Sequence, residues 1–221
     1  MDGFLVAGKV DPEFLETVER SNIPTVLIDF EHDGCPAILI DNKEGARQAI
    51  YHLVEQGHRT IAFLGADTVH PSIRGRLEGY KLALSASGLS VDERLIITSE
   101  RGEPDMETGR MLSERLLSLG PMPTAVFCAN DALALTVLNL AKDRSIDVPE
   151  DLAVVGFDDV DGASRSTPGL TSVKVFKEHL GELAVRYLAE LITIGPDSRK
   201  RYERSSHTVL VPTELIIRGL A

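Results

Sequence analysis

Several common sequence signals are scarce or absent in this chain of 221 residues. It has two cysteines, Cys35 and Cys128, which are too few for a disulfide framework. Cys128 lies in an apolar run, where a small buried hydrophobic residue is the usual interpretation of a cysteine. No apolar run reaches the roughly 18 residues of a membrane-spanning helix. The start of the chain also lacks the basic segment of a signal peptide. We therefore expect a cytoplasmic protein.

The signatures of common enzymes and metal sites are missing as well. No glycine-rich phosphate-binding loop follows a predicted strand, and there is neither a Gly-x-Ser-x-Gly elbow nor a His-Glu-x-x-His motif. The six histidines are scattered, and His52 and His58 are spaced so that they do not share one helix face. We expect no enzymatic activity, no metal and no cofactor.

Basic residues are outnumbered. The chain has 23 lysines and arginines against 34 aspartates and glutamates, a net charge of −11. Neutralising phosphates requires a basic surface, so this chain is not expected to bind nucleic acid by itself. The one basic cluster, residues 199–201, has glycine, proline, aspartate and serine on its N-terminal side, and it is interpreted as a solvated loop.

Residues 123–159 predict a strand, a helix and a second strand. The runs 124–129 and 152–157 are almost wholly apolar, as parallel strands covered on both faces must be. Between them, residues 132–145 repeat apolar side chains at helical spacing, with Asn130 or Asp131 available as the N-cap. Both strands end in polar residues, and ligands of open α/β sheets bind at such carboxyl ends.

The rest of the chain continues this alternation, which predicts the α/β class with right-handed parallel units. Residues 161–168 are polar and rich in turn-forming residues, so turns are predicted there. The other predicted strands span 2–8, 24–29, 37–40, 60–65, 95–98, 170–173 and 208–211, and the other helices span 12–21, 42–56, 72–87, 106–119 and 178–194.

Six motifs follow one another along the chain. They are Ile40-Asp-Asn-Lys-Glu-Gly-Ala-Arg-Gln-Ala49 with His52-Leu-Val-Glu-Gln-Gly-His-Arg-Thr-Ile-Ala-Phe-Leu-Gly65, Arg74-Gly-Arg-Leu-Glu-Gly-Tyr80, Pro123-Thr-Ala-Val-Phe-Cys-Ala-Asn-Asp131, Val154-Val-Gly-Phe-Asp-Asp159, Pro168-Gly-Leu-Thr-Ser-Val173 and Val211-Pro-Thr-Glu-Leu215. Together, in register and in the family's order, they resemble the lactose-repressor (LacI/GalR) family of transcription regulators over essentially the whole chain.

This resemblance implies an effector-sensing domain of two Rossmann-like lobes, of the periplasmic-binding-protein type I kind. The first lobe would take residues 1–40 plus 174–211, and the second 41–173 plus 212–221. The family's DNA-binding helix-turn-helix and two further strand-helix units would precede residue 1, so the first lobe is expected to be incomplete. Residues 4–7 would then present an apolar sheet edge.

The resemblance also assigns effector-binding residues in the second lobe. Arg76 matches the family's effector-binding arginine, whose guanidinium suits paired hydroxyls or a carboxylate. The alternative is a surface arginine paired with a nearby glutamate. Asp158 matches the ligand aspartate at the end of its strand, and the alternative is a turn or helix cap, a role that Asp159 or Asp161 could fill instead.

Three further positions complete the expected site. Asn130 can donate and accept hydrogen bonds, but capping its own helix is an equal alternative. Ser72 lies four residues before Arg76, where serines also start helices. Asp29 ends a first-lobe strand and would face the effector from the other side, with a plain loop aspartate as the alternative.

The expected ligand is sugar-like. Pro104 and Val175 stand where many relatives carry a stacking aromatic and a glutamine, which disfavours a large planar ring, whereas arginine, asparagine and aspartate suit a polyol. Such an effector would shift an open–closed equilibrium that controls DNA binding in a full-length, dimeric regulator. The alternatives are the solute-binding protein of a sugar transport system and a Rossmann-type enzyme.

Overall fold

The computed structural model describes residues 2–8, 10–21, 23–32, 34–99, 106–194, 208–219 and 221. The chain divides into two compact units. Unit 1 comprises Met1–Asp41 and Phe176–Pro212, and unit 2 comprises Asn42–Val175 and Thr213–Ala221. The chain therefore passes from one unit to the other three times. No helix within the described ranges is both long and apolar enough to cross a membrane.

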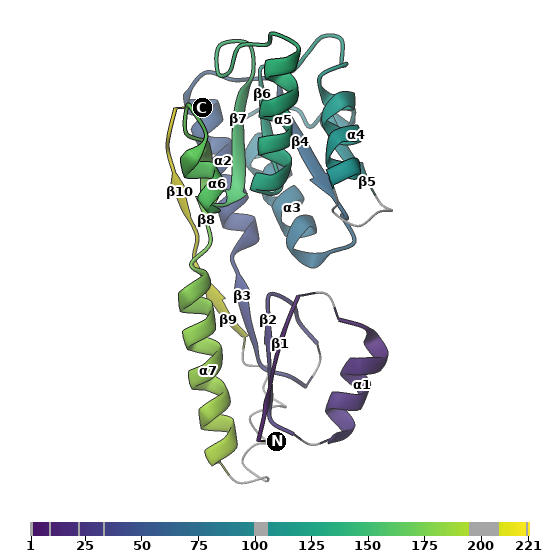
Figure 1. The fold of residues 1–221 in the computed structure, drawn as a ribbon, viewed down its shortest axis with the longest axis vertical. Helices are drawn as coiled ribbons and strands as arrows, with labels where there is room; N and C mark the ends of the chain where they lie inside the picture. The colour runs from purple at the N-terminus through teal and green to yellow at the C-terminus, as the bar shows by residue number, and fades with distance from the viewer. Residues whose placement is uncertain are drawn as a thin grey trace. The chain divides into compact units, whose positions relative to one another are not determined.

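Unit 1 contains a parallel four-stranded sheet in the order β1-β2-β3-β9 (Figure 1). Its helix α7 packs on β1, β2 and β3. Buried apolar side chains such as Leu27 and Phe30 form its core. The elements are β1 Phe4–Ala7, α1 Pro12–Ser21, β2 Thr25–Ile28, β3 Ala37–Ile40, α7 Lys177–Thr193 and β9 Thr208–Val211.

The edge of this sheet carries the apolar strand that the sequence predicted. Among the described residues β1 pairs only with β2, and the side chain of Leu5 is 41% exposed. An apolar edge strand with unpaired backbone groups is a common site of further strand pairing.

Unit 2 contains a six-stranded sheet in the order β10-β8-β7-β6-β4-β5, parallel except for β10. Its elements are α2 Asn42–Glu55, β4 Ile61–Ala66, α3 Pro71–Ala86, the 3-10 helix η1 Glu93–Leu95, β5 Ile96–Ser99, α4 Met106–Leu116, β6 Ala125–Cys128, α5 Asp131–Asp143, β7 Ala153–Asp158, α6 Asp161–Arg165, β8 Thr171–Lys174 and β10 Glu214–Ile216. Helix α6 is a correction, because the sequence predicted only turns there.

Helices cover both faces of this second sheet (Figure 1). Helix α2 packs on α3, and helix α4 packs on α5. The crossover from β4 to β5 runs in one direction along the sheet, and those from β5 to β6 and from β6 to β7 run in the other. Because such crossovers are right-handed, α3 lies on one face of the sheet and α4 and α5 lie on the other. The central strands β4 and β6 are apolar throughout because both of their faces are covered, and every residue of these two strands is buried.

The strand order changes direction next to β4. From β4 the chain crosses to β5 on one side, and the next strand along the chain, β6, lies on the other side. Two neighbouring strands whose connections leave in opposite directions form a topological switch point, and ligands of open α/β sheets bind beyond its carboxyl ends. This topology directs attention to the residues that follow Ala66 and Cys128.

Candidate functional site

A small cavity lies at this switch point. It has a volume of about 130 Å³. Residues from the ends of β4 and β6 and from helices α4 and α5 line it: Ala66, Met106, Gly109, Asn130, Ala132, Leu133 and Thr136. Asn130 is the one residue of this lining that the sequence selected.

Arg76 lies beside this point, buried in helix α3 with 4% of its surface exposed. Its Nε donates to Oδ1 of Asn42 at 2.8 Å, and its Nη1 donates to the carbonyl oxygen of Ala129. Its guanidinium carbon lies 3.7 Å from the centre of the Phe157 ring, a cation–π contact. The alternative of a surface arginine paired with a glutamate is wrong, because the side chain is buried and its carboxylate partner is an aspartate.

That partner is Asp158, the last residue of β7. Its Oδ1 lies 3.2 Å from Nη2 of Arg76, and its side chain is 28% exposed, against 5% for the side chain of Arg76. A fixed guanidinium and a partly exposed carboxylate side by side offer a polar ligand both a donor and an acceptor. Asp158 is not a helix cap, because the N-cap of α6 is Val160, which makes no side-chain cap hydrogen bond.

The backbone at the end of β7 is unusual. Asp158 has φ 101° and Asp159 has φ 46°, a region that residues with a Cβ seldom adopt. Asp159 turns away from Asp158 and forms its own ion pair, with Nη1 of Arg218 at 2.8 Å from its Oδ1. The two adjacent carboxylates thus pair with two different arginines. Strained residues of this kind cluster at ligand sites.

Asn130 is the N-cap of helix α5. Its Oδ1 accepts a hydrogen bond from the amide of Leu133 at 2.9 Å, which resolves the choice between Asn130 and Asp131 as the cap. Asn130 also lines the small cavity, and it follows Ala129, whose carbonyl holds Arg76. Asn130 therefore caps α5 through its Oδ1 and also lines the small cavity.

The other two predicted residues are placed differently. Ser72 is buried in the first turn of α3, and its amide donates to Nδ1 of His70 at 3.3 Å. Asp29 follows β2 in unit 1, where φ is 65°. The structure therefore brings Arg76 and Asp158 into direct contact, and Ser72 and Asn130 belong to the same unit. Asp29 belongs to the other unit.

The sequence did not identify Asp131 as a buried carboxylate. None of its surface is exposed. Its Oδ1 accepts from the hydroxyl of Ser172 at 2.6 Å, and its Oδ2 accepts from the amide of Val160 at 2.8 Å. The pKa of this carboxyl is raised from 3.8 to about 6 in all: burial raises it most, the two hydrogen bonds lower it, and the nearby carboxylates of Asp158 and Asp159 raise it.

Two contacts of Arg76 were also missed. Asn42 was assigned only to the start of a helix, although it lies in the Ile40-Asp-Asn motif that supports the family resemblance. Phe157 was assigned only to a buried strand. A buried guanidinium needs hydrogen-bond acceptors, and this requirement was the signal that could have pointed to Asn42. The sequence carried no comparable signal for the ring of Phe157, which contacts the guanidinium through its face.

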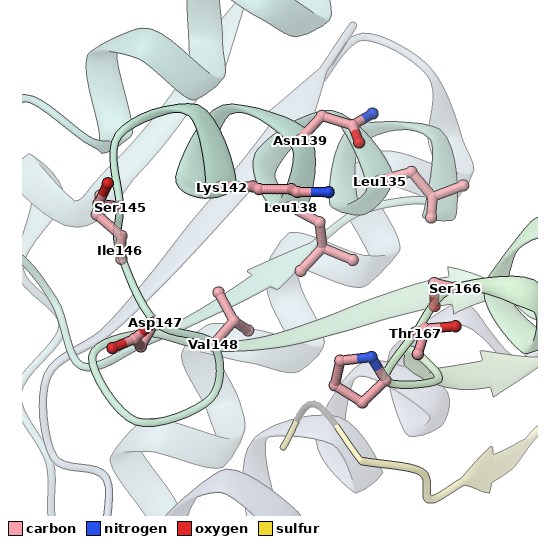
Figure 2. A pocket seen from close by; sticks show the side chains of 11 residues that line it. Leu135, Leu138, Asn139, Lys142, Ser145, Ile146, Asp147, Val148, Ser166 and Thr167 are labelled. Atoms are coloured by element: carbon pink, nitrogen blue, oxygen red, sulfur yellow. The ribbon is translucent and has the colours of Figure 1, made fainter.

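A larger cavity of about 520 Å³ lies elsewhere in unit 2, beside helix α5 (Figure 2). Leu135, Leu138 and Lys142 of α5 lie across from Ser166 and Thr167. Its other segments, residues 145–148 and 166–168, precede β7 and β8, so it opens at the amino ends of these strands. Ligands of open α/β sheets bind at the carboxyl ends, so the smaller cavity is the better candidate.

The Cys128 thiol in unit 2 is buried. Burial raises the pKa of the Cys128 thiol above its ordinary range, so it is a poor nucleophile. Within the described ranges, no three histidine, cysteine, aspartate or glutamate side chains are grouped so that they could hold a metal ion. Of the two positions that disfavoured a planar ligand, Val175 is buried, and Pro104 lies outside the described residues.

Comparison with known proteins gives a consistent result. Residues 50–219 match the family model of the periplasmic binding protein-like domain. The chain is 32% identical over 221 residues to the probable transcriptional repressor ExuR of Bacillus subtilis, covering 98% of this chain and 63% of ExuR. It is 34% identical over 225 residues to the transcriptional repressor CytR of Escherichia coli K12, covering 99% of this chain and 62% of CytR. The chain thus spans slightly less than two thirds of the length of these relatives.

A solved structure with the same fold is the transcriptional regulator CelR in complex with cellobiose. The TM-score is 0.86 at 30% sequence identity, and the match covers all of this chain and 66% of CelR. The agreement extends over both compact units. It confirms the predicted α/β fold of the periplasmic-binding-protein kind.

Proposed function

The chain belongs to the periplasmic binding protein-like domain family, in the group of LacI-type transcription regulators, and on that premise we propose that it senses a small sugar-like effector. The observation that supports this is the Arg76–Asp158 pair at the carboxyl ends of the unit 2 strands. The arginine is held in one orientation by Asn42 and Ala129, so it is ready for a ligand before the ligand arrives.

The chemistry of this pair favours a polyol. A hydroxyl group can accept from a guanidinium and donate to a carboxylate, and neighbouring hydroxyls of a sugar can do both at once. Asn130 would add a donor at the small cavity, and Ser72 would add a hydroxyl one helical turn before Arg76. CelR, which shares the fold, was solved with cellobiose, and this makes a disaccharide a reasonable first probe.

The proposed mechanism is a shift between conformational populations. In this proposal an effector contacts both units, with Asp29 contributing from unit 1, and binds a closed arrangement better than an open one. It can move the equilibrium only by that difference in affinity. In a longer protein the shift would control the affinity of a separate DNA-binding segment, as expected for a repressor.

The partners follow from the same proposal. We propose that the chain acts in a homodimer, that DNA is contacted only through a further domain, and that the regulator works in the cytoplasm, where its DNA target would be. A solute-binding protein of a transport system is the weaker alternative, because the named relatives are transcriptional repressors.

Isothermal titration calorimetry and thermal shift with cellobiose, glucose, ribose and adenine test this proposal. A ligand that binds only the folded state stabilises it by about 2.7 kcal/mol at a concentration of 100 Kd. We expect one of the sugars to bind and adenine to be inert. Asp158→Asn should weaken that sugar at least tenfold. Asp161→Asn, an exposed aspartate three residues later, is the matched control and should leave affinity unchanged. Absence of binding by every sugar, or equal effects of the two variants, would contradict the proposal.

A further inference from the structure

Two buried polar side chains lie directly behind the candidate site. The carboxylate of Asp131 and the hydroxyl of Ser172 are both fully buried and 2.6 Å apart. They come from different elements, because Asp131 begins helix α5 and Ser172 lies in strand β8. Burying a charge is costly unless it is fully hydrogen-bonded, so such a pair needs an explanation beyond packing.

Both side chains bind the backbone of the turn that follows Asp158. The amide of Val160 donates to Oδ2 of Asp131 at 2.8 Å. The amide of Asp159 donates to the hydroxyl oxygen of Ser172 at 3.2 Å, and this hydroxyl in turn donates to Oδ1 of Asp131. One carboxylate therefore fixes two consecutive backbone amides, one directly and one through a hydroxyl.

The turn that they fix is strained. Positive φ angles at Asp158 and Asp159 are unfavourable for residues with a Cβ and persist only where the surroundings hold them. This backbone directs the Asp158 carboxylate to Arg76 and the Asp159 carboxylate to Arg218. If the two amides lost their acceptors, the backbone could relax and the direction of Asp158 would change.

Strand β7 leaves room for this arrangement. A Cβ added to Gly156 would overlap Oδ1 of Asp131. Glycine at this position is therefore required by the close approach of the Asp131 carboxylate to the strand, rather than by its own backbone angle. The space at Gly156, the acceptors on Asp131 and Ser172, and the strained Asp158–Asp159 turn thus depend on one another.

We propose that Asp131 and Ser172 are positioning residues, which hold the Asp158–Asp159 turn so that Asp158 pairs with Arg76 and is presented to the effector. The part that concerns the effector depends on the proposed function. The part that concerns the Asp158–Arg76 pair does not, and it can be tested without a ligand.

The arrangement should respond to pH. An ionised Asp131 accepts both hydrogen bonds, whereas protonation converts one oxygen into a donor and removes an acceptor. The charged groups that face it are the carboxylates of Asp158 and Asp159, each paired with an arginine, and the neighbouring thiol is that of Cys128. Burial and these carboxylates raise the pKa of Asp131 to about 6, so protonation falls in an accessible range.

The test uses the full chain, Asp131→Asn, Ser172→Ala and the control Ser113→Ala. Ser113 is an equally buried serine, but within the described part of the chain its hydroxyl bonds only the carbonyl of Gly109, in helix α4. In NMR spectra of the ligand-free protein, the Val160 amide and the Arg76 Nε–H signals should titrate together with a midpoint near pH 6. This titration should vanish in Asp131→Asn. At pH 7.5 Ser172→Ala should shift both the Asp159 amide and Arg76 Nε–H, and Ser113→Ala should shift neither.

A second measurement separates this inference from the proposed function. Ser172→Ala should weaken the sugar that binds, cellobiose being the first one tried, at least tenfold relative to Ser113→Ala at pH 7.5, and wild-type affinity should fall as the pH drops below 6. If neither cellobiose, glucose nor ribose binds the wild type, the proposed ligand is wrong, and the ligand-free spectra still decide the positioning role. Unchanged Arg76 Nε–H signals in both Asp131→Asn and Ser172→Ala would overturn the inference, whatever the result with cellobiose.

Discussion

Replacing Arg76 by methionine should destabilise unit 2 strongly. Methionine keeps an apolar stem of similar length but removes the guanidinium, so the Asn42 oxygen, the Ala129 carbonyl and the Asp158 carboxylate lose the donor that Arg76 provides. A hydrogen bond to a charged group contributes about 1.5–3 kcal/mol, and breaking a buried ion pair costs about 3–5 kcal/mol. The two energies cannot be summed, because both interactions are made by the same guanidinium. Water also reaches the Asp158 carboxylate, which reduces the cost of leaving it unpaired. We therefore expect a loss of about 3–4 kcal/mol.

Urea unfolding followed by circular dichroism at pH 7 measures this loss. The control is Arg110→Met on helix α4, because Arg110 pairs with Glu114 at the surface, where ion pairs contribute about 0–1 kcal/mol. Arg76→Lys keeps the charge but not the planar fork, so it should fall between the two. A loss below about 1 kcal/mol for Arg76→Met, or one equal to that of the control, would show that Arg76 is not held as the structure indicates.

Three further changes probe the same unit. Gly156→Ala places a Cβ against the Asp131 carboxylate and should cost about 1–3 kcal/mol in urea unfolding, and a neutral result would refute the close approach. Gly79→Ala should cost a similar amount, because its Cβ would meet the carbonyl of Lys43 and the side chain of Ala46 where α3 packs on α2. Asp131 should make stability fall with rising pH. The pKa of Asp131 in the folded state, about 6, lies above its ordinary value of 3.8, so the folded state binds the proton more tightly than the unfolded state. The resulting contribution to the free energy of unfolding is full below about pH 3.8 and is lost as the pH rises through 6. The unfolding free energy of the wild type minus that of Asp131→Asn should drop by ~2 kcal/mol between pH 4 and pH 7, and a flat difference would contradict the raised pKa.

Local patterns predicted most of the secondary structure of this chain. The apolar runs that became β6 and β7 could be located from the sequence to within one residue, because strands covered on both faces must be apolar along their length. Helix α6 could not be predicted in this way. Its residues are polar and turn-forming, and the helix is held by contacts outside its own five residues: it packs on α5, Ala163 is fully buried, and the carbonyl of Ala163 accepts the amide of Leu170.

The site was only partly predictable. Arg76 and Asp158 came from the family resemblance, and the structure shows that they are paired. The effector role of all five selected residues stays a prediction, and Asp29 lies in the other compact unit. The switch point next to β4 was not predicted at all, because it depends on the strand order, and neither periodicity nor composition specifies which strands pair.

Asp131 shows why the remaining residues were missed. In the sequence, Asn130 and Asp131 were equivalent candidates for a helix cap, because both side chains accept hydrogen bonds from backbone amides. In the structure these adjacent residues have different roles. Asn130 caps α5, whereas the carboxylate of Asp131 bonds to Ser172, 41 residues later, in the space that Gly156 leaves. Whether a carboxylate caps locally or is buried is thus decided by residues that are distant in sequence, and these distant residues make Asp131 the group that sets the backbone of the Asp158 turn.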